Sequence, residues 1–342
     1  MLYGGAAVAS VIACVYLCLR KGNAFAADVT PPVSLRRWAA AFFAVAFLGH
    51  VWWYLFFIFS GDIYSVSCLV VAVIDSVSLL ITITGTLLAM LQDRKRPVWP
   101  ALVIAMPFVA LAGALMAYPS RLLEQMTVYY ILLLYVLFTG YMVVMIRQYG
   151  RWLNDNYADL ENKKVWLSQT VALVCMLLFI LYVFSTNMVL IWLIHIIQLV
   201  LVGLLLWRVE TLPQLPDLAD QPLAAPATID LAQIEQLLAE HCVGTQLYLQ
   251  HDLTLQQLAQ AVGTNRFYLS QYFSRQSITY NSYINNLRIN HFISRYQEVS
   301  CSQQPFTVQQ LANESGYRSY STFSLAFKQR TGQSVTAWMR GR

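Results

Sequence analysis

Two stretches near the C-terminal end repeat one pattern of residue types, and each sets out side chains able to hydrogen-bond a base pair. Residues 253–263 (LTLQQLAQAVG) and 306–316 (FTVQQLANESG) each place Thr at a helix start, Leu and Ala on one face, and Gly at the end. A second short segment follows each, at 268–273 and 322–327, with apolar pairs four residues apart. Helix, glycine turn and helix is the helix-turn-helix pattern, which here occurs twice, 53 residues apart.

The second helix of each pair leaves polar and aromatic side chains facing outward, and its N-terminal residues are expected to meet base edges in a major groove. Gln and Arg hydrogen-bond purine edges, and aromatic rings contact the thymine methyl group. The candidate base contacts are Arg266, Phe267, Ser270 and Gln271 in the first unit, and Ser319, Tyr320, Ser321, Thr322 and Leu325 in the second. The candidate phosphate contacts, which add affinity without sequence choice, are Arg275, Arg288, Arg318, Lys328 and Arg330. The alternative for any single one is an ordinary solvated surface position.

This part of the chain resembles the AraC/XylS family of transcription regulators. Residues 316–332 (GYRSYSTFSLAFKQRTG) and 337–340 (AWMR) follow the family's signature nearly throughout, and residues 283–289 (YINNLRI) look like the helix that joins its two halves. The resemblance covers roughly residues 230–342 and implies binding to promoter DNA and a contact with RNA polymerase.

The chain departs from the family pattern in three places. The stretch 275–278 lacks the Gly usual after the first recognition helix, Val335 stands where Pro is usual, and Leu325 stands where Arg is common. The replacement of Arg by Leu325 weakens the expectation that the second unit contacts DNA bases. Family members often dimerise through another domain, so the helix predicted over residues 230–242 is either a dimerisation helix or the first packing helix of the DNA-binding domain.

The composition excludes a wholly soluble chain. Hydrophobic residues make up 58% and charged residues 11%, whereas an ordinary soluble domain carries about 25% charge. Disorder is excluded too, because it requires low hydrophobicity and high net charge. The amino-acid composition becomes less apolar from about residue 208 on. Within this part, residues 242–342 hold nine basic and three acidic residues, a balance that favours an anionic partner.

The first part of the chain reads as seven apolar stretches, six of them long enough to cross about 30 Å of hydrocarbon. They are residues 3–19, 38–59, 66–91, 98–117, 127–146, 165–184 and 188–207. The first is the shortest and has no basic residue before it, which favours a retained helix over a cleaved signal peptide. The six cysteines do not suggest a disulfide framework, because four lie within apolar stretches and the other two fall in the part expected in the cytoplasm.

Loop charges predict the orientation. The loops after the first, third and fifth stretches hold eleven Lys and Arg residues, and the alternate loops hold only Arg121. By the positive-inside rule the N-terminus lies outside and the C-terminal part in the cytoplasm. We expect a multi-pass protein of the bacterial inner membrane.

Three ionisable residues, His50, Asp75 and His195, fall inside the apolar stretches at similar predicted depth. Such residues are costly in lipid and favour a functional site, here a ligand pocket or proton-sensitive sensing site; the alternative is an interhelical hydrogen bond. The last stretch has no Lys, which excludes a retinal Schiff base. The spans carry no nucleophile elbow and no zinc-protease motif, so we expect no catalytic residues, no metal, no cofactor and no enzyme activity.

The sequence therefore predicts an all-α protein in three parts: a seven-span transmembrane bundle over residues 1–207, a Pro-rich linker over 208–229, and an AraC-type domain over 230–342. The predicted function is a membrane-embedded one-component transcription regulator. The expected partners are promoter DNA, the lipid bilayer, an unknown signal ligand or membrane protein, RNA polymerase and, as a possibility, a second copy. The alternatives are a receptor or transporter-like protein whose tail is a protein-interaction module, and a bundle that only anchors the chain.

Overall fold

The computed structural model describes residues 1–20, 30–59, 66–183, 189–216, 231–302 and 305–341. It confirms the all-α prediction: within these ranges the regular structure is helical, apart from one isolated bridge between Tyr157 and Thr254. The chain divides into two units. Unit 1 comprises Met1–Tyr149 and Val165–Pro216, and unit 2 comprises Gly150–Lys164 and Asp217–Arg342.

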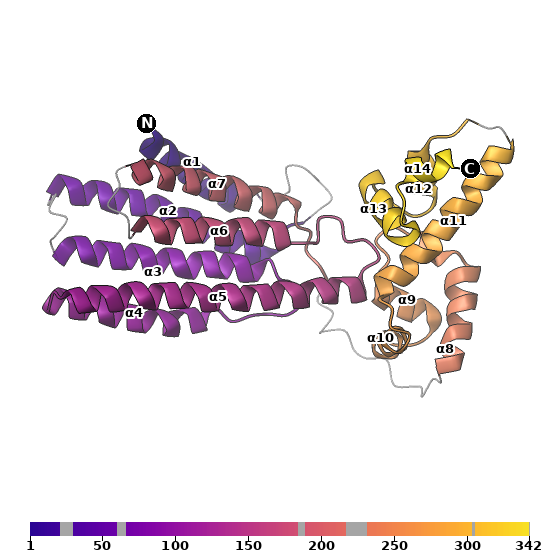
Figure 1. Cartoon of the computed structure of the whole chain (residues 1–342), viewed down its shortest axis with the longest axis horizontal. Helices are drawn as coiled ribbons and strands as arrows, with labels where there is room; N and C mark the ends of the chain where they lie inside the picture. The colour runs from indigo at the N-terminus through magenta and orange to yellow at the C-terminus, as the bar shows by residue number, and fades with distance from the viewer. Residues whose placement is uncertain (21–29, 60–65, 184–188, 217–230, 303–304, 342) are drawn as a thin grey trace. The chain divides into compact units, whose positions relative to one another are not determined.

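Each of the seven apolar stretches lies in its own helix (Figure 1). The helices are α1 (Leu2–Leu19), α2 (Val33–Phe59), α3 (Val66–Ala89), α4 (Trp99–Ala117), α5 (Arg121–Asn156), α6 (Trp166–Val183) and α7 (Val189–Thr211). Six of them are long and apolar enough to cross a membrane, and the described apolar part of α6, Trp166–Leu181, is shorter. Length and composition thus support six spans, and the seventh stays a prediction.

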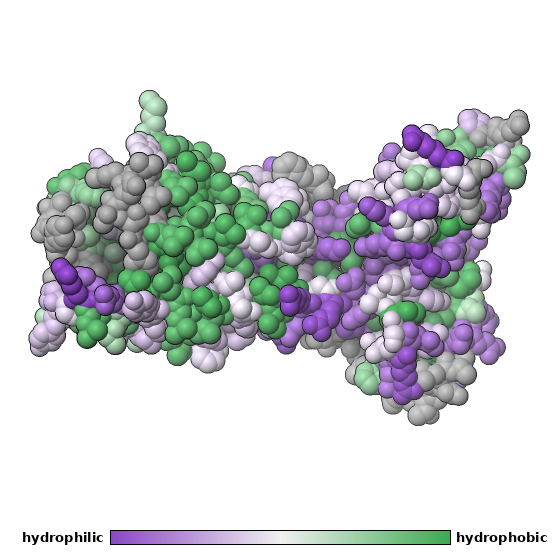
Figure 2. Space-filling view, viewed as in Figure 1, coloured by the Kyte–Doolittle hydropathy of each residue, from purple (hydrophilic) through white to green (hydrophobic). Residues whose placement is uncertain are grey.

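Unit 1 is a bundle in which α2 packs against both α1 and α3, while α7 packs against α1 and α6. A few polar side chains link its helices where hydrocarbon offers no partner. The Gln169 amide donates to the carbonyl of Leu87 at 2.7 Å, and the Gln198 amide donates to the Ser10 hydroxyl at 2.9 Å. The large apolar side chains on the outside, among them Trp52, remain exposed. Figure 2 shows this hydrophobic surface, which suits contact with lipid chains.

Two helices of unit 1 continue past the C-terminal ends of the predicted apolar stretches. Helix α5 continues ten residues past 146 and ends at Asn156, so its last residues, from Gly150, belong to unit 2. Helix α7 ends at Thr211, inside the region predicted as linker. The rest of the predicted linker, from residue 217 on, lies outside the described residues.

Unit 2 contains the two predicted helix-turn-helix units (Figure 1). Its helices are α8 (Leu231–Leu238), α9 (Leu255–Val262), α10 (Arg266–Arg275), α11 (Tyr280–Ser302), α12 (Val308–Glu314), α13 (Tyr320–Thr331) and α14 (Val335–Arg340). A π-helical turn, Ala239–Gly244, and a short 3₁₀ helix, Leu247–Leu249, separate α8 from α9.

Helix α11 joins two small hydrophobic cores. Its first part contributes Ile284 to a core with α8, α9 and α10, and its second part contributes Phe292 to a core with α12, α13 and α14. Ile234 and Leu238 of α8 are buried in the first of these cores. Of the two roles predicted for this helix, the structure therefore supports packing within the domain.

Candidate nucleic-acid interface

The first helix-turn-helix unit is formed by α9 and α10. Thr254 caps α9: its hydroxyl accepts from the backbone N–H of Gln257, and the Gln257 amide oxygen accepts from the N–H of Thr254. Gly263 ends the helix at φ 74°, a left-handed conformation that favours glycine. Asn265 then caps α10 by accepting from the N–H of Tyr268.

The second unit repeats this local chemistry in α12 and α13. Thr307 caps α12, and Ser319 caps α13 by accepting from the N–H of Thr322. Gly316, at φ 88°, makes the turn, and a side chain there would meet the carbonyl oxygen of Leu249 at 2.8 Å. The predicted Thr caps and Gly turns are confirmed.

Recognition helix α10 has the predicted faces. Leu269 and Phe273 are buried, together with Tyr272. Phe267 is 62% exposed, and Ser270 and Gln271 are exposed as well. These three candidate base contacts are therefore free to face a partner.

Recognition helix α13 is arranged in the same way. Phe323 and Phe327 point into the second core, while Tyr320, Ser321 and Leu325 are exposed. Ser319 and Thr322 are half-buried at the N-terminal end, where their hydroxyls lie 3.0 Å apart. Their places agree with the prediction for groove-facing residues, whose contact with DNA stays a prediction.

Four of the five candidate phosphate contacts lie at the surface of unit 2. Arg275, Lys328 and Arg330 are exposed in the last turns of α10 and α13. The Arg318 side chain is 66% exposed and pairs with the carboxylate of Asp252 at 3.2 Å. Exposed cations beside the recognition helices suit contact with a phosphate backbone.

Arg288 corrects the prediction. It is only 1% exposed, and its guanidinium donates to the carbonyl oxygens of Tyr248 and Gln250, both at 2.7 Å. Its guanidinium also lies 5.5 Å from the ring centroid of Tyr317. Burial lowers the pKa of this group, although Tyr317 opposes the shift. Arg288 ties the two cores together from α11, and its guanidinium is bonded inside the domain rather than exposed at its surface.

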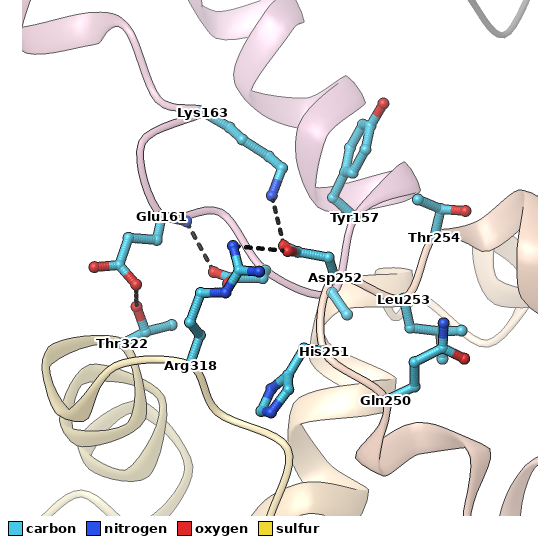
Figure 3. Close-up of polar contacts among 12 residues, drawn as sticks. Tyr157, Glu161, Lys163, Gln250, His251, Asp252, Leu253, Thr254, Arg318 and Thr322 are labelled. Atoms are coloured by element: carbon cyan, nitrogen blue, oxygen red, sulfur yellow. Dashed lines mark hydrogen bonds and ion pairs between the residues drawn. The ribbon is translucent and has the colours of Figure 1, made fainter. Parts of the chain in front are cut away.

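The segment Tyr157–Lys164, called here the docking segment, packs on this same domain (Figure 3). The N–H of Ala158 donates to the carbonyl of Leu253 at 3.1 Å. The Asn281 amide of α11 donates to the carbonyls of both Tyr157 and Ala158, at 3.1 and 2.7 Å. Ala158 itself is buried in the first core.

Side chains of the docking segment extend to both helix-turn-helix units. The Lys163 ammonium is 3.1 Å from the Asp252 carboxylate, which also receives Arg318 (Figure 3). The Glu161 carboxylate accepts from the Thr322 hydroxyl at 3.2 Å. Burial alone raises the pKa of Asp252, but Lys163 and Arg318 outweigh it and hold that pKa below its ordinary value.

The sequence placed this segment in the membrane domain, where Lys163 and Lys164 served only to set orientation. The signal that was available is its mixed charge: the loop over residues 147–164 holds Asp155, Asp159 and Glu161 besides four basic residues. A short polar loop has no hydrophobic periodicity, so sequence patterns do not predict what it contacts.

In unit 1 the structure brings together the ionisable residues predicted for sensing. The rings of His50 and His195 have centroids 5.6 Å apart, and the Tyr3 ring lies 4.7 Å from that of His50. Asp75 accepts a hydrogen bond from the indole N–H of Trp53 at 3.3 Å. A Cβ built on Gly49, which precedes His50, would lie 2.6 Å from the Asp75 carboxylate, so Asp75 borders this cluster.

Comparison with known proteins supports the reading of unit 2. The model of a helix-turn-helix domain family matches residues 258–341, which comprise most of α9 and all of α10 to α14. No curated protein and no solved structure matches the chain.

Proposed function

We propose, from the AraC-type helix-turn-helix domain that residues 258–341 form, that the chain is a membrane-embedded one-component transcription regulator. The observation that carries the proposal is the pair of capped recognition helices, α10 and α13, fixed on the single helix α11. Both expose polar and aromatic residues in their N-terminal turns, the part of a recognition helix that meets base edges. Two such helices on one chain suit neighbouring major-groove segments of promoter DNA.

The membrane part of the proposal rests on the apolar helices of unit 1 and on the loop charges. Seven spans put the N-terminus outside and the DNA-binding domain in the cytoplasm, beside the chromosome and RNA polymerase. The His50, His195 and Asp75 cluster supports a sensing role for the bundle, because ionisable groups within spans are costly unless they serve a function. A small ligand or a membrane protein is the proposed signal.

The test uses the full chain in lipid nanodiscs and the duplex immediately upstream of its own coding sequence. We expect binding that falls steeply with rising salt, since each neutralised phosphate releases counterions. Arg266→Ala and Tyr320→Ala are each expected to weaken binding to this duplex by about tenfold or more, the scale of one base contact. Gln297→Ala, an exposed change on α11 outside the recognition helices, is the control.

Salt-independent binding, or none, would favour the rival function, a receptor whose tail binds protein. The sensing role has its own test in signal-dependent transcription from the same promoter. If His50→Ala and Asp75→Asn both leave the response unchanged, the bundle serves only as an anchor.

A further inference from the structure

The docking segment reaches the N-terminal end of recognition helix α13. Glu161 bonds to Thr322 in the first turn of α13, and Ser319, the cap of that helix, bonds to the same hydroxyl. A helix N-terminus with its free N–H groups attracts anions, which is why phosphate groups bind there. The Glu161 carboxylate thus stands at the end of α13 that an anionic duplex would approach.

The segment also joins the ion pair of a cation proposed to contact DNA. Arg266, the first residue of α10, is half-buried, and burial lowers its pKa. Arg318 is paired with Asp252, and Lys163, 7% exposed, completes that ion cluster. In this state Lys163 of the segment and Arg318 share the Asp252 carboxylate.

The position of the segment is set by backbone and core contacts rather than by surface charge alone. Tyr157 forms the isolated bridge with Thr254, and Ala158 fills part of the first core. The segment follows α5 without a break, because the N–H of Tyr157 still donates to the carbonyl of Leu153. Helix α5 itself has residues in both units, so one continuous helix leads from the apolar bundle to the segment.

We propose that residues 157–164 are an intramolecular competitor of DNA. Docked, they hold the Glu161 carboxylate at the N-terminal end of α13; released, they leave that end open to a duplex. The inference rests on the proposed DNA-binding function and assigns its regulation to this segment. The alternative is a permanent strut that stays docked while DNA binds.

Two charge-removing variants weaken docking without disturbing the recognition helices. Asp252→Asn removes the negative charge that both ion pairs share, and Asn tolerates the left-handed backbone of this position, φ 54°. Glu161→Gln removes the charge at α13. Glu298→Gln is the matched control, because Glu298 pairs with Arg295 on the surface of α11, away from the segment.

Adjacent lysines report docking independently of DNA. Lys163 is buried and Lys164 is exposed, so acetylation of the full chain in nanodiscs is expected to modify Lys164 quickly and Lys163 slowly. In Asp252→Asn, Lys163 is expected to react at nearly the rate of Lys164. Adding the upstream duplex to the unmodified protein is expected to accelerate Lys163 alone; an unchanged Lys163 rate with bound DNA overturns the proposal.

The affinity measurement completes the test. The double variant Asp252→Asn with Glu161→Gln is expected to bind the duplex about tenfold more tightly than wild type, because a larger fraction of the protein is competent. Conversely, a carbodiimide can join Lys163 to Asp252 by an amide bond across their 3.1 Å ion pair. This coupling holds the segment docked and is expected to abolish binding of the duplex. Asp252→Asn treated in the same way is the control.

The outcomes separate the two proposals. Equal affinity of wild type, released and coupled protein overturns the competitor and leaves DNA binding intact. No binding by the released variant, with Lys163 shown to be reactive, overturns both.

Discussion

Arg288 is a buried cation that serves as a structural link. Its guanidinium donates to the carbonyl oxygens of Tyr248, in the short 3₁₀ helix before α9, and of Gln250, which follows it, and lies over the ring of Tyr317. Those contacts connect α11 to both helix-turn-helix units. Its energetic role is therefore to satisfy backbone acceptors that folding removes from water.

We predict that Arg288→Met lowers the free energy of unfolding of the C-terminal domain by about 2–5 kcal/mol, since it leaves buried carbonyl oxygens unpaired. Pulse proteolysis of the full chain, read on fragments of the domain, measures this. Arg330→Ala, at an exposed site on α13, is expected to change it by less than about 0.5 kcal/mol.

The same pair of variants distinguishes a structural from a phosphate-contacting arginine. Protein carrying Arg288→Met that remains folded is expected to keep the wild-type salt slope of DNA binding, whereas loss of a phosphate contact lowers that slope by about one. A lowered slope with normal stability would restore the phosphate role for Arg288.

At the scale of elements, the docking segment is expected to stay docked only within a defined pH range. The pKa of Asp252 lies below its ordinary value, so its contribution to docking is complete above about pH 4 and is lost as the pH falls through the lowered pKa. Burial raises the pKa of Tyr157 to about 12, so Tyr157 opposes docking only above about pH 10. The charged groups facing Asp252 are Lys163, Arg318 and His251.

We therefore predict that docking is constant between about pH 5 and 8 and weakens below about pH 4. Hydrogen exchange of the Ala158 amide, bonded to the Leu253 carbonyl, measures it after correction for intrinsic rates. Amides in the middle of α11 are the control for global unfolding. Loss of Ala158 protection between pH 5 and 7 would contradict this prediction.

Sequence patterns could predict some parts of this fold and not others. The caps Thr254 and Thr307 and the turn at Gly263 depend on local chemistry, and all three were predictable. The burial of Arg288 and the docking of Glu161 depend on contacts between residues far apart in sequence. Residue type and periodicity do not report such contacts, and an Arg near a recognition helix reads as a phosphate ligand whether or not it is buried.

At the scale of the whole molecule, the loop over residues 147–164 combines the charge bias with contacts to the helix-turn-helix domain. Loop charges predict a cytoplasmic location for residues 147–164, with eleven basic residues against one. The contacts put the docking segment on a helix-turn-helix domain, which can meet DNA only in the cytoplasm. The charge bias and the packing both favour the proposed orientation.

We predict that a membrane-impermeant maleimide distinguishes the two ends of α5 in a background without native cysteines. Arg121→Cys, at the start of the helix, is expected to react in intact cells. Lys164→Cys, just beyond its end and exposed, is expected to react only after the inner membrane is opened. Each variant removes one charge from a bias of eleven to one, too little to reverse insertion. Reaction of Lys164→Cys in intact cells would place the docking segment and its domain outside, where promoter DNA is absent, and would overturn the regulator as proposed.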